Sequence, residues 1–291
     1  MNRSLVVLEM LRNKSIELQM KSDALLSGYV TEQVALKLAQ CDIEHKFLLK
    51  NGNDLELSAY KREVYGKLIY AYQKDPDEDF YASVALFFDQ KMNRETEDGL
   101  IFSWEIKRQT DRVMIRLHAR IGDRRVPVHI QVDRTNPQKN PQERSIRLIM
   151  ENSKSEKLLL YPYVTQIFED YSELLEKLSL LQDMSVLERI YEGLEHTLFE
   201  GRDVARSLTR LEEEHHLKMD EQRYHQFLSC VNNPYLKKRW NAYKKKRSLT
   251  KPEYEALMSR LISFLKPVWE ERLAGMVYLG SWLPELGRYL D

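Results

Sequence analysis

The sequence is poor in the residues that mark disulfide-rich or repetitive proteins. Its 291 residues include two cysteines, Cys41 and Cys230, with 10 glycines and 9 prolines. Cysteines so far apart give neither a disulfide framework nor the ligand spacing of a zinc site, so we expect no structural metal and a reducing, cytoplasmic setting. No low-complexity segment and no internal repeat is visible.

A net charge and a long apolar run are also missing. Lys+Arg and Asp+Glu both number 45, so the formal net charge at pH 7 is zero, and a nucleic-acid surface would have to be a local patch. No run approaches the roughly 18 apolar residues of a membrane span, and the N-terminal stretch regains charge too early for a signal peptide. The composition predicts a soluble globular protein without a membrane partner.

The pattern of apolar residues predicts an α+β fold in two parts. Helical spacing predicts two amphipathic helices over 4–40 and further helices from 163 onward, whereas 45–50 fits a short strand and 60–73 fits either type. Alternation predicts a strand over 99–109 and a hairpin over 111–133 that turns at Gly122-Asp123. A polar loop is expected over 134–145 and a strand over 146–150. The predicted domains are therefore an α/β core with N-terminal helices, 1–160, and a C-terminal helical domain, 161–291.

Several segments resemble, in their order and spacing, the abortive-infection nucleotidyltransferases of the AbiEii/AbiGii toxin type. They include "HKFLLKNG", "EDGLIFSWEIKRQ", "MIRLHARIGDRRVPVHIQVD", "LLLYPYVTQIFED", "NNPYLKKRWNAYKK" and "LISFLKPVWEERL", spread over roughly 4–273. The resemblance implies a nucleotidyltransferase-like mixed sheet with a C-terminal helical bundle, and a bacterial toxin–antitoxin or phage-defence context. It also implies transfer of a nucleotide to an RNA acceptor, with Mg²⁺ and a nucleoside triphosphate as cofactors.

The residues that would carry this chemistry are largely replaced. The family's alternating acid pair, which holds the metal, would fall where Lys67-Leu68-Ile69 stand, and its phosphate-binding lysine would fall at Asp170. The glycine turn lacks its second small residue. We therefore interpret the turn as a vestigial nucleotide-binding loop, formed by Lys50, Asn51, Gly52 and Asn53.

A few acids remain as candidates for a rearranged catalytic site. Asp133 matches the third acid that the family carries at a strand end, although an aspartate there is also a common turn former. Asp183 is the remaining acid of a later two-acid motif, and Glu169 stands where the family has a glutamate at the start of its first C-terminal helix. Asp54 and Glu56 alternate directly after the glycine, but they also fit a polar turn.

Two basic groups are candidate nucleic-acid surfaces, because cations can contact phosphates while an aromatic ring stacks on a base. The first group could also be a solvated helix with its aromatic residues facing the core. Its members are Lys237, Lys238, Arg239, Trp240, Lys244, Lys245, Lys246 and Arg247. The second group lies on or near the hairpin, where strand-edge protection is the alternative. Its members are Arg116, Arg120, Arg124, Arg125 and Arg134, and His118 and His129 on the same hairpin could face each other.

Two functional hypotheses remain open, beside an unassigned α+β domain. In the first, the protein is catalytically degenerate and acts as a binding or scaffold subunit for a protein or RNA partner. In the second, it is an active nucleotidyltransferase with a rearranged site. Convergence of two carboxylates near Gly52 would favour the second. Both hypotheses require Asp133 to lie near the Gly52 turn, and we further expect Phe264 and Trp269 to be buried in the helical part.

Overall fold

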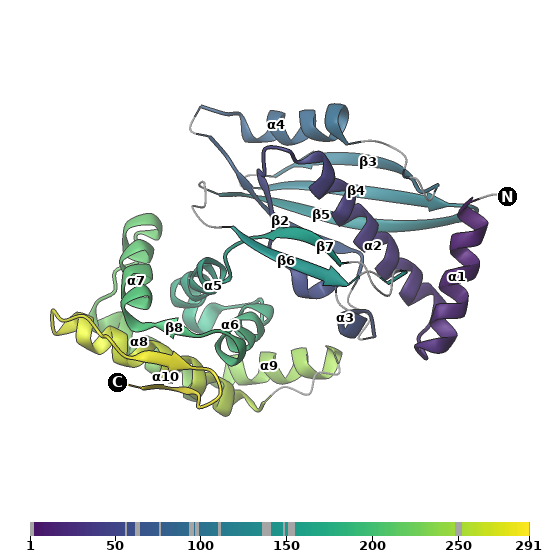
Figure 1. The fold of residues 1–291 in the computed structure, drawn as a ribbon. Coiled ribbons are helices and arrows are strands. Elements are labelled where there is room, and N and C mark those ends of the chain that lie inside the picture. Colours follow the sequence, from purple (N-terminus) through teal and green to yellow (C-terminus); the bar gives the residue numbers. More distant parts are fainter. Residues whose placement is uncertain are drawn as a thin grey trace. The chain divides into compact units, whose positions relative to one another are not determined.

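A computed structural model describes residues 3–55, 57–61, 65–75, 77–92, 96, 99–109, 112–135, 141–147, 149–150, 155–247 and 252–290. The chain divides into two compact units, Met1–Pro162 and Tyr163–Asp291. The first unit is a mixed sheet with helices, and the second is mostly helical (Figure 1). The predicted α+β fold class is thereby confirmed.

The first unit is built around a seven-stranded sheet in the order β3-β4-β5-β2-β1-β7-β6. Strands β2 and β5 are parallel, as are β1 and β7, and the other neighbours are antiparallel. The strands are β1 (Phe47–Leu49), β2 (Lys67–Gln73), β3 (Ile101–Arg108), β4 (Arg112–Ile121), β5 (Arg124–Thr135), β6 (Gln142–Arg147) and β7 (Ser155–Leu160). The helical elements are α1 (Arg3–Glu17), α2 (Ser22–Cys41), η1 (Gly52–Leu55), α3 (Leu57–Lys61), α4 (Phe80–Leu86) and η2 (Phe87–Lys91).

The predicted hairpin is confirmed as β4 and β5. Val113, Ile115 and Leu117 of β4 are buried, whereas the residues between them face away from the core. Gly122 closes the turn with a φ of 58°, a left-handed conformation that glycine adopts without steric cost.

The structure settles one assignment that the sequence left open and shows that another was wrong. The ambiguous region 60–73 contains the end of α3 and the strand β2. The loop expected over 134–145 and the strand expected over 146–150 are wrong in their bounds, because β6 already begins at Gln142. This strand lies at the edge of the sheet, where charged side chains are common because they discourage pairing with another strand.

The two faces of the sheet differ in character. On one face, residues of β2, β4 and β5 join residues of α1, α2, α3 and α4 in a single apolar cluster. On the other face, the described residues form only a small apolar cluster of Leu48, Ala71 and Tyr161, with Leu159 packed against it. We call this second side the polar face.

The second unit has an aromatic core. Phe264 and Trp269 are fully buried, as predicted, and so are Trp240 and Trp282. The helical elements are α5 (Tyr163–Lys177), η3 (Leu178–Leu180), α6 (Ser185–His196), α7 (Gly201–His215), α8 (Glu221–Ser229), η4 (Cys230–Asn232), α9 (Pro234–Arg247) and α10 (Tyr254–Leu273). A small sheet, ordered β10-β9-β8, closes this unit and consists of β8 (Phe199–Glu200), β9 (Ser281–Leu283) and β10 (Arg288–Leu290).

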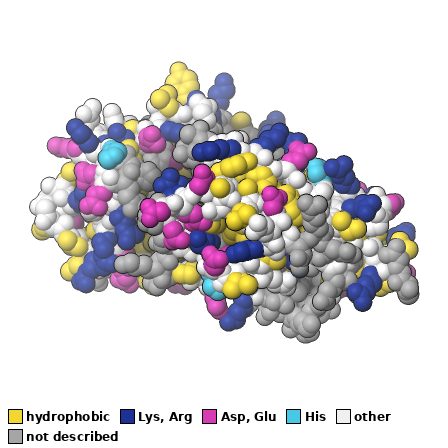
Figure 2. All heavy atoms as spheres, turned by 90° about the horizontal axis from the view of Figure 1, so that it is seen from above, with side chains coloured by type: hydrophobic (Ala, Val, Ile, Leu, Met, Phe, Trp, Pro, Cys, Tyr) yellow, Lys and Arg dark blue, Asp and Glu magenta, His cyan; other side chains and the backbone are white. Residues whose placement is uncertain are grey.

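Charge and hydrophobicity show no strong segregation on the face drawn in Figure 2, where Lys and Arg side chains are interspersed with Asp and Glu side chains. Among the described residues, no helix combines the length and the apolar character that a membrane crossing requires.

Candidate functional site

The strands β1, β2 and β5 lie side by side and bring Lys50 next to Asp133. Lys50 directly follows β1, and its Nζ is 3.8 Å from Oδ2 of Asp133. Strand register places Asp133 beside Ala71 and Ala71 beside Leu48, whereas Asn51 of the glycine turn bonds to Lys67 and Ile69 near the start of β2. The Lys50 side chain therefore reaches Asp133, while the expected proximity of Asp133 to Gly52 itself stays a prediction. Lys50 is only 14% exposed and Asp133 is 24% exposed.

Asp133 is surrounded by donors and cations. Gln131 donates a hydrogen bond from Nε2 to Oδ1 of Asp133 at 2.9 Å, and Nε of Arg112 lies 3.8 Å from the same oxygen. The Nζ of Lys50 also lies 5.1 Å from the centroid of the Tyr161 ring. The Asp133 carboxylate is therefore balanced by two cations, which favours an ion-pair role.

The neighbouring strand β2 supplies no second carboxylate. Strand register places Ala71 directly beside Asp133 and Ile69 beside Gln131, with Lys67 and Gln73 at the ends of the same face. The sequence prediction had put the lost acid pair at Lys67 and Ile69. Both residues share this face of β2, and the residue directly next to Asp133 is Ala71, a small residue that is buried.

A divalent metal does not fit this arrangement. Mg²⁺ needs oxygen ligands in near-octahedral geometry, usually with one or two carboxylates and the substrate phosphates. Here one carboxylate is present, and Lys50 and Arg112 lie beside it. Across the part of the chain that the structure describes, no group of three or more His, Cys, Asp and Glu side chains could hold a metal ion.

The turn after β1 has structural explanations for both of its distinctive residues. The Asn51 side chain accepts from the backbone N–H of Ile69 at 2.8 Å and donates to the carbonyl of Lys67 at 3.0 Å, so it extends the strand pairing. A Cβ at Gly52 would lie 2.8 Å from a Leu160 methyl, so a larger residue would require the Leu160 side chain to move. Asp54 accepts from Asn51 at 2.8 Å and places a negative charge in the turn. The Asn53 side chain and all of Glu56 lie outside the described residues.

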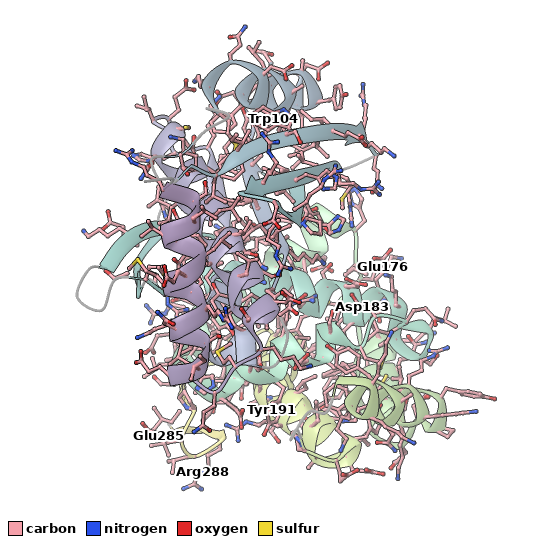
Figure 3. The ribbon with its side chains drawn as sticks, turned by 90° about the vertical axis from the view of Figure 1, so that its right-hand side faces the viewer. Trp104, Glu176, Asp183, Tyr191, Glu285 and Arg288 are labelled. Carbon is pink, nitrogen blue, oxygen red and sulfur yellow. The ribbon has the colours of Figure 1, made fainter. Side chains whose placement is uncertain are left out.

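The other two candidate acids belong to the second unit. Asp183, labelled in Figure 3, accepts from the backbone N–H of Ser185 at 3.0 Å and from its hydroxyl at 2.6 Å, where α6 begins. These bonds hold the turn directly before α6, whose N-cap residue is Met184. Glu169 is half-buried on α5 and makes contacts of its own.

Asp170 also has a structural partner. Its carboxylate accepts from Nε of Arg189 on α6 at 3.0 and 3.1 Å. Burial lowers the pKa of Arg189, but the hydrogen bonds and the charge of Asp170 outweigh this effect and raise it. The acid at the family's lysine position therefore joins two helices.

The basic segment on α9 matches the solvated-helix alternative. Trp240 is fully buried, and its Nε1 donates to the carbonyl of Pro252 at 3.1 Å, so the role of stacking on a base is wrong for this residue. Lys237 and Lys244 pair with acids, and Arg239 donates to two backbone carbonyls. Lys238, Lys245 and Lys246 are exposed, and the Arg247 side chain lies outside the described residues.

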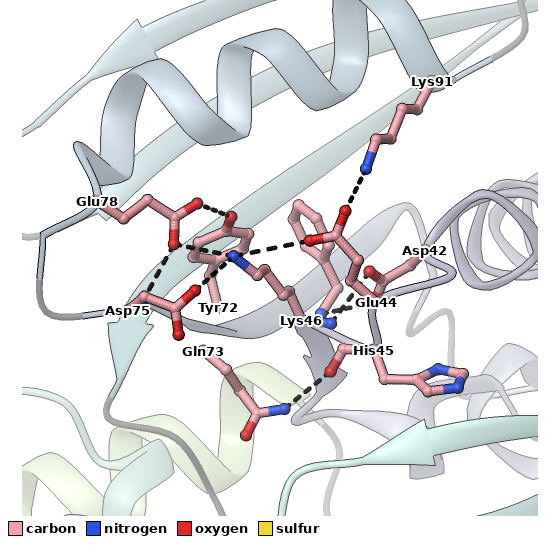
Figure 4. Close-up of polar contacts among 10 residues, drawn as sticks. Asp42, Glu44, His45, Lys46, Tyr72, Gln73, Asp75, Glu78 and Lys91 are labelled. Carbon is pink, nitrogen blue, oxygen red and sulfur yellow. Dashed lines mark hydrogen bonds and ion pairs between the residues drawn. The ribbon is translucent and has the colours of Figure 1, made fainter.

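Sequence reasoning missed an ionic network at the opposite end of β1 and β2 (Figure 4). Lys46 lies 3.0 Å from Asp75, 3.1 Å from Glu78 and 3.8 Å from Glu44. The Tyr72 hydroxyl also donates to Glu78 at 2.6 Å. Burial alone would raise the pKa of Glu78, but hydrogen bonds that include those from Tyr72 and Lys46 lower it to about 2. The network joins the start of β1 to the loop before α4, and no single motif in the sequence predicts it.

Comparison with known proteins gives similarity in fold only. No family model and no curated protein matches the chain. A "putative nucleotidyltransferase" from H. pylori is 11% identical over 81% of this chain and 95% of its own, with a TM-score of 0.41. JHP933 from Helicobacter pylori is 10% identical over 85% of this chain and 97% of its own, with a TM-score of 0.40. Neither similarity singles out the AbiEii/AbiGii family.

Proposed function

We propose that the chain is a nucleotidyltransferase-fold protein, related to the AbiEii/AbiGii type, that has lost nucleotidyl transfer and acts in the cytoplasm as a binding or scaffold subunit. One observation carries the proposal. Asp133, at the position of the third catalytic acid, is paired with Lys50 and Arg112 and has no second carboxylate beside it on β2.

The loss of metal accounts for the loss of the reaction. In nucleotidyl transfer, divalent metal bridges the triphosphate and offsets several kcal/mol of developing negative charge. Each 1.36 kcal/mol of lost stabilisation slows a reaction about tenfold, so several kcal/mol correspond to a loss of several orders of magnitude. The glycine turn does not compensate, because Asn51 is bound to β2 and Asp54 would repel a phosphate.

A second candidate function is an active, toxin-type nucleotidyltransferase with a rearranged site. The observation that favours it is the partial exposure of Asp133, which leaves its carboxylate accessible. Such an enzyme would use Asp133 with Asp54 of the same unit, and would need Mg²⁺, a nucleoside triphosphate and an RNA acceptor.

A transfer assay separates the two functions. The protein is incubated with each labelled nucleoside triphosphate, Mg²⁺ or Mn²⁺, and total tRNA, and we expect no labelled RNA. A labelled product that disappears in Asp133→Ala and persists in Asp203→Ala would contradict the proposal. Asp203 is an exposed acid of α7 and serves as the matched control.

A further inference from the structure

The hairpin β4–β5 carries a ladder of basic side chains on the polar face. Residues that are directly opposite each other on paired strands point to the same side of the sheet. The register pairs are Arg112 with Asp133, Arg116 with His129, and Arg120 with Arg125. These residues share the side of Ala71, opposite the apolar cluster with the helices.

Protection of a sheet edge does not explain this ladder. Strand β4 lies between β3 and β5, and β5 lies between β4 and β2, so both strands are interior. Charges that guard against edge-to-edge pairing are needed on β3 and β6 instead. The sequence alone left this alternative open, and the strand order removes it for Arg116, Arg120 and Arg125.

One of the register pairs destabilises the hairpin. Like charges directly opposite each other on antiparallel strands are destabilising. Arg120 and Arg125 form such a pair, and both side chains are exposed. A bound anion between the two guanidinium groups would relieve the repulsion.

The basic charge of this ladder is only partly neutralised. Among the described carboxylates, only Asp133 forms an ion pair with an arginine of the ladder, and that arginine is Arg112. Glu105 on β3 lies opposite Arg116 in register. The pKa of His118 is lowered by burial first and then by the charge of Arg125, with Arg116 and His129 acting in the same direction and Glu105 opposing them.

We propose that this polar face binds single-stranded nucleic acid along the hairpin. Arg116, Arg120 and Arg125 contact the phosphates, while the imidazole rings of His118 and His129 and the guanidinium planes offer surfaces on which bases stack. This proposal names the class of ligand that the proposed binding subunit would take, and in this respect it rests on the proposed function.

The length of the ladder favours a repeating polyanion over a single phosphate. A strand rises about 3.4 Å per residue, so Arg116 and Arg120 lie about 13–14 Å apart along β4. One phosphate cannot contact both of them. A chain with regularly repeated phosphates and unpaired bases meets both the charge spacing and the stacking surfaces.

Fluorescence anisotropy with labelled oligonucleotides of about 20 residues tests the proposal, in the absence of metal and nucleotide. The full chain should bind single-stranded RNA or DNA at about 50 mM salt and bind more weakly at about 200 mM. The variant Arg116→Gln/Arg120→Gln/Arg125→Gln should bind at least tenfold more weakly. Its slope of log affinity against log salt should be smaller by about 2, because each lost single-strand phosphate contact removes about 0.7.

The matched control is Lys238→Gln/Lys245→Gln/Lys246→Gln, which removes the same charge from exposed positions of α9. It should retain the affinity of the unmodified protein. Equal losses of affinity in both variants would show that binding depends on non-specific charge, which would contradict the proposal. A loss of affinity only in the α9 variant would show that nucleic acid binds at α9 and not at the hairpin. Circular dichroism melts establish that each variant is folded.

Three other outcomes would overturn the proposal. They are no binding at about 50 mM salt, tighter binding of duplex than of single strands, and competition by polyglutamate equal to that of RNA, which would indicate an acidic protein partner. A labelled product in the separate transfer assay would contradict the loss of catalysis without affecting this inference, because binding is measured without metal.

Discussion

At the scale of single residues, the role of an acid is decided by its neighbours. A carboxylate beside another carboxylate can share a metal, whereas one beside cations forms ion pairs. Asp133 has Lys50 and Arg112 within 4 Å and Ala71 beside it on the next strand. Asp133 is therefore a counter-charge to two cations on the polar face.

Substitution of Asp133 by Asn tests this role. Since the pairs are partly exposed, we expect the free energy of unfolding to change by less than about 1 kcal/mol. The affinity for single-stranded RNA should increase several-fold, because a negative charge is removed from the binding face. Anisotropy and urea unfolding measure the two effects, with Asp203→Asn as the control. Weaker binding by Asp133→Asn would mean that the carboxylate takes part in recognition.

Substitution of Arg120 by Gln tests the like-charge pair. In the absence of ligand, the variant should be more stable by a few tenths of a kcal/mol, because the repulsion from Arg125 is relieved. The urea midpoint should rise slightly with an unchanged slope. Arg202→Gln removes an exposed charge from α7 and should leave the midpoint unchanged. A lower midpoint for Arg120→Gln would show that this guanidinium stabilises the hairpin.

At the scale of elements, ion pairs join helices, strands and loops whose contact the sequence does not predict. Asp170 and Arg189 connect α5 to α6, and the Lys46 network connects the start of β1 to the loop before α4. In both cases, charged side chains pair with partners from another element. Their expected effects are therefore on stability.

The variant Asp170→Asn should destabilise the second unit by about 2–3 kcal/mol. Breaking a buried ion pair costs roughly 3–5 kcal/mol, and the value is reduced here because Arg189 keeps some contact with water. Urea unfolding monitored by tryptophan fluorescence measures the change. Asp203→Asn, which loses only an exposed pair, is the control. An unchanged free energy of unfolding for Asp170→Asn would contradict the prediction and show that water solvates Arg189 as well as the carboxylate does.

The Glu78 carboxylate should make stability depend on acid pH. Its folded-state pKa of about 2 lies below the usual value of 4.5. The stability that it contributes is therefore present above a pH of about 4.5 and is lost as the pH falls toward about 2. Glu78→Gln should be less stable at neutral pH and should lose less stability over this window than the unmodified protein. Parallel pH curves for the two proteins would contradict the prediction, and Glu213→Gln on α7 serves as the control.

At the scale of the whole molecule, a formal net charge of zero coexists with a local basic ladder. Bulk charge predicts no polyanion partner, but the ladder concentrates arginines on one face of an interior hairpin. Binding by such a face depends strongly on salt, because counterions are released from the nucleic acid. If metal binding is lost, Mg²⁺ should not stabilise the folded protein. If the polar face binds nucleic acid, single-stranded RNA should stabilise it.

A thermal-shift series tests both together. Single-stranded RNA at about 100 times its dissociation constant should stabilise the folded protein by about 2.7 kcal/mol and raise its melting temperature. Mg²⁺, alone or with a nucleoside triphosphate, should leave the melting temperature unchanged, because the described carboxylates form no metal cluster. A rise with Mg²⁺ that Asp133→Ala abolishes would favour the active enzyme.

The sequence by itself determined the features that depend on local periodicity. Alternation in β4 and β5 already implies that Arg112, Arg116 and Arg120 share one side, because side chains in a strand alternate with a period of two. The absence of any acid over 67–73 could likewise be read directly, and so could the helical spacing that buries Phe264 and Trp269.

Only the tertiary structure decided which residues become neighbours across strands and helices. In the tertiary structure, Ala71 lies beside Asp133, β4 and β5 are interior strands, and Trp240 is buried in the core of the second unit. The physical reason is that strand order and helix packing are set by contacts between distant segments, each of which must offset the entropy of closing a long loop. Local patterns fix the side on which a residue lies, but they carry no information about the segment that lies opposite.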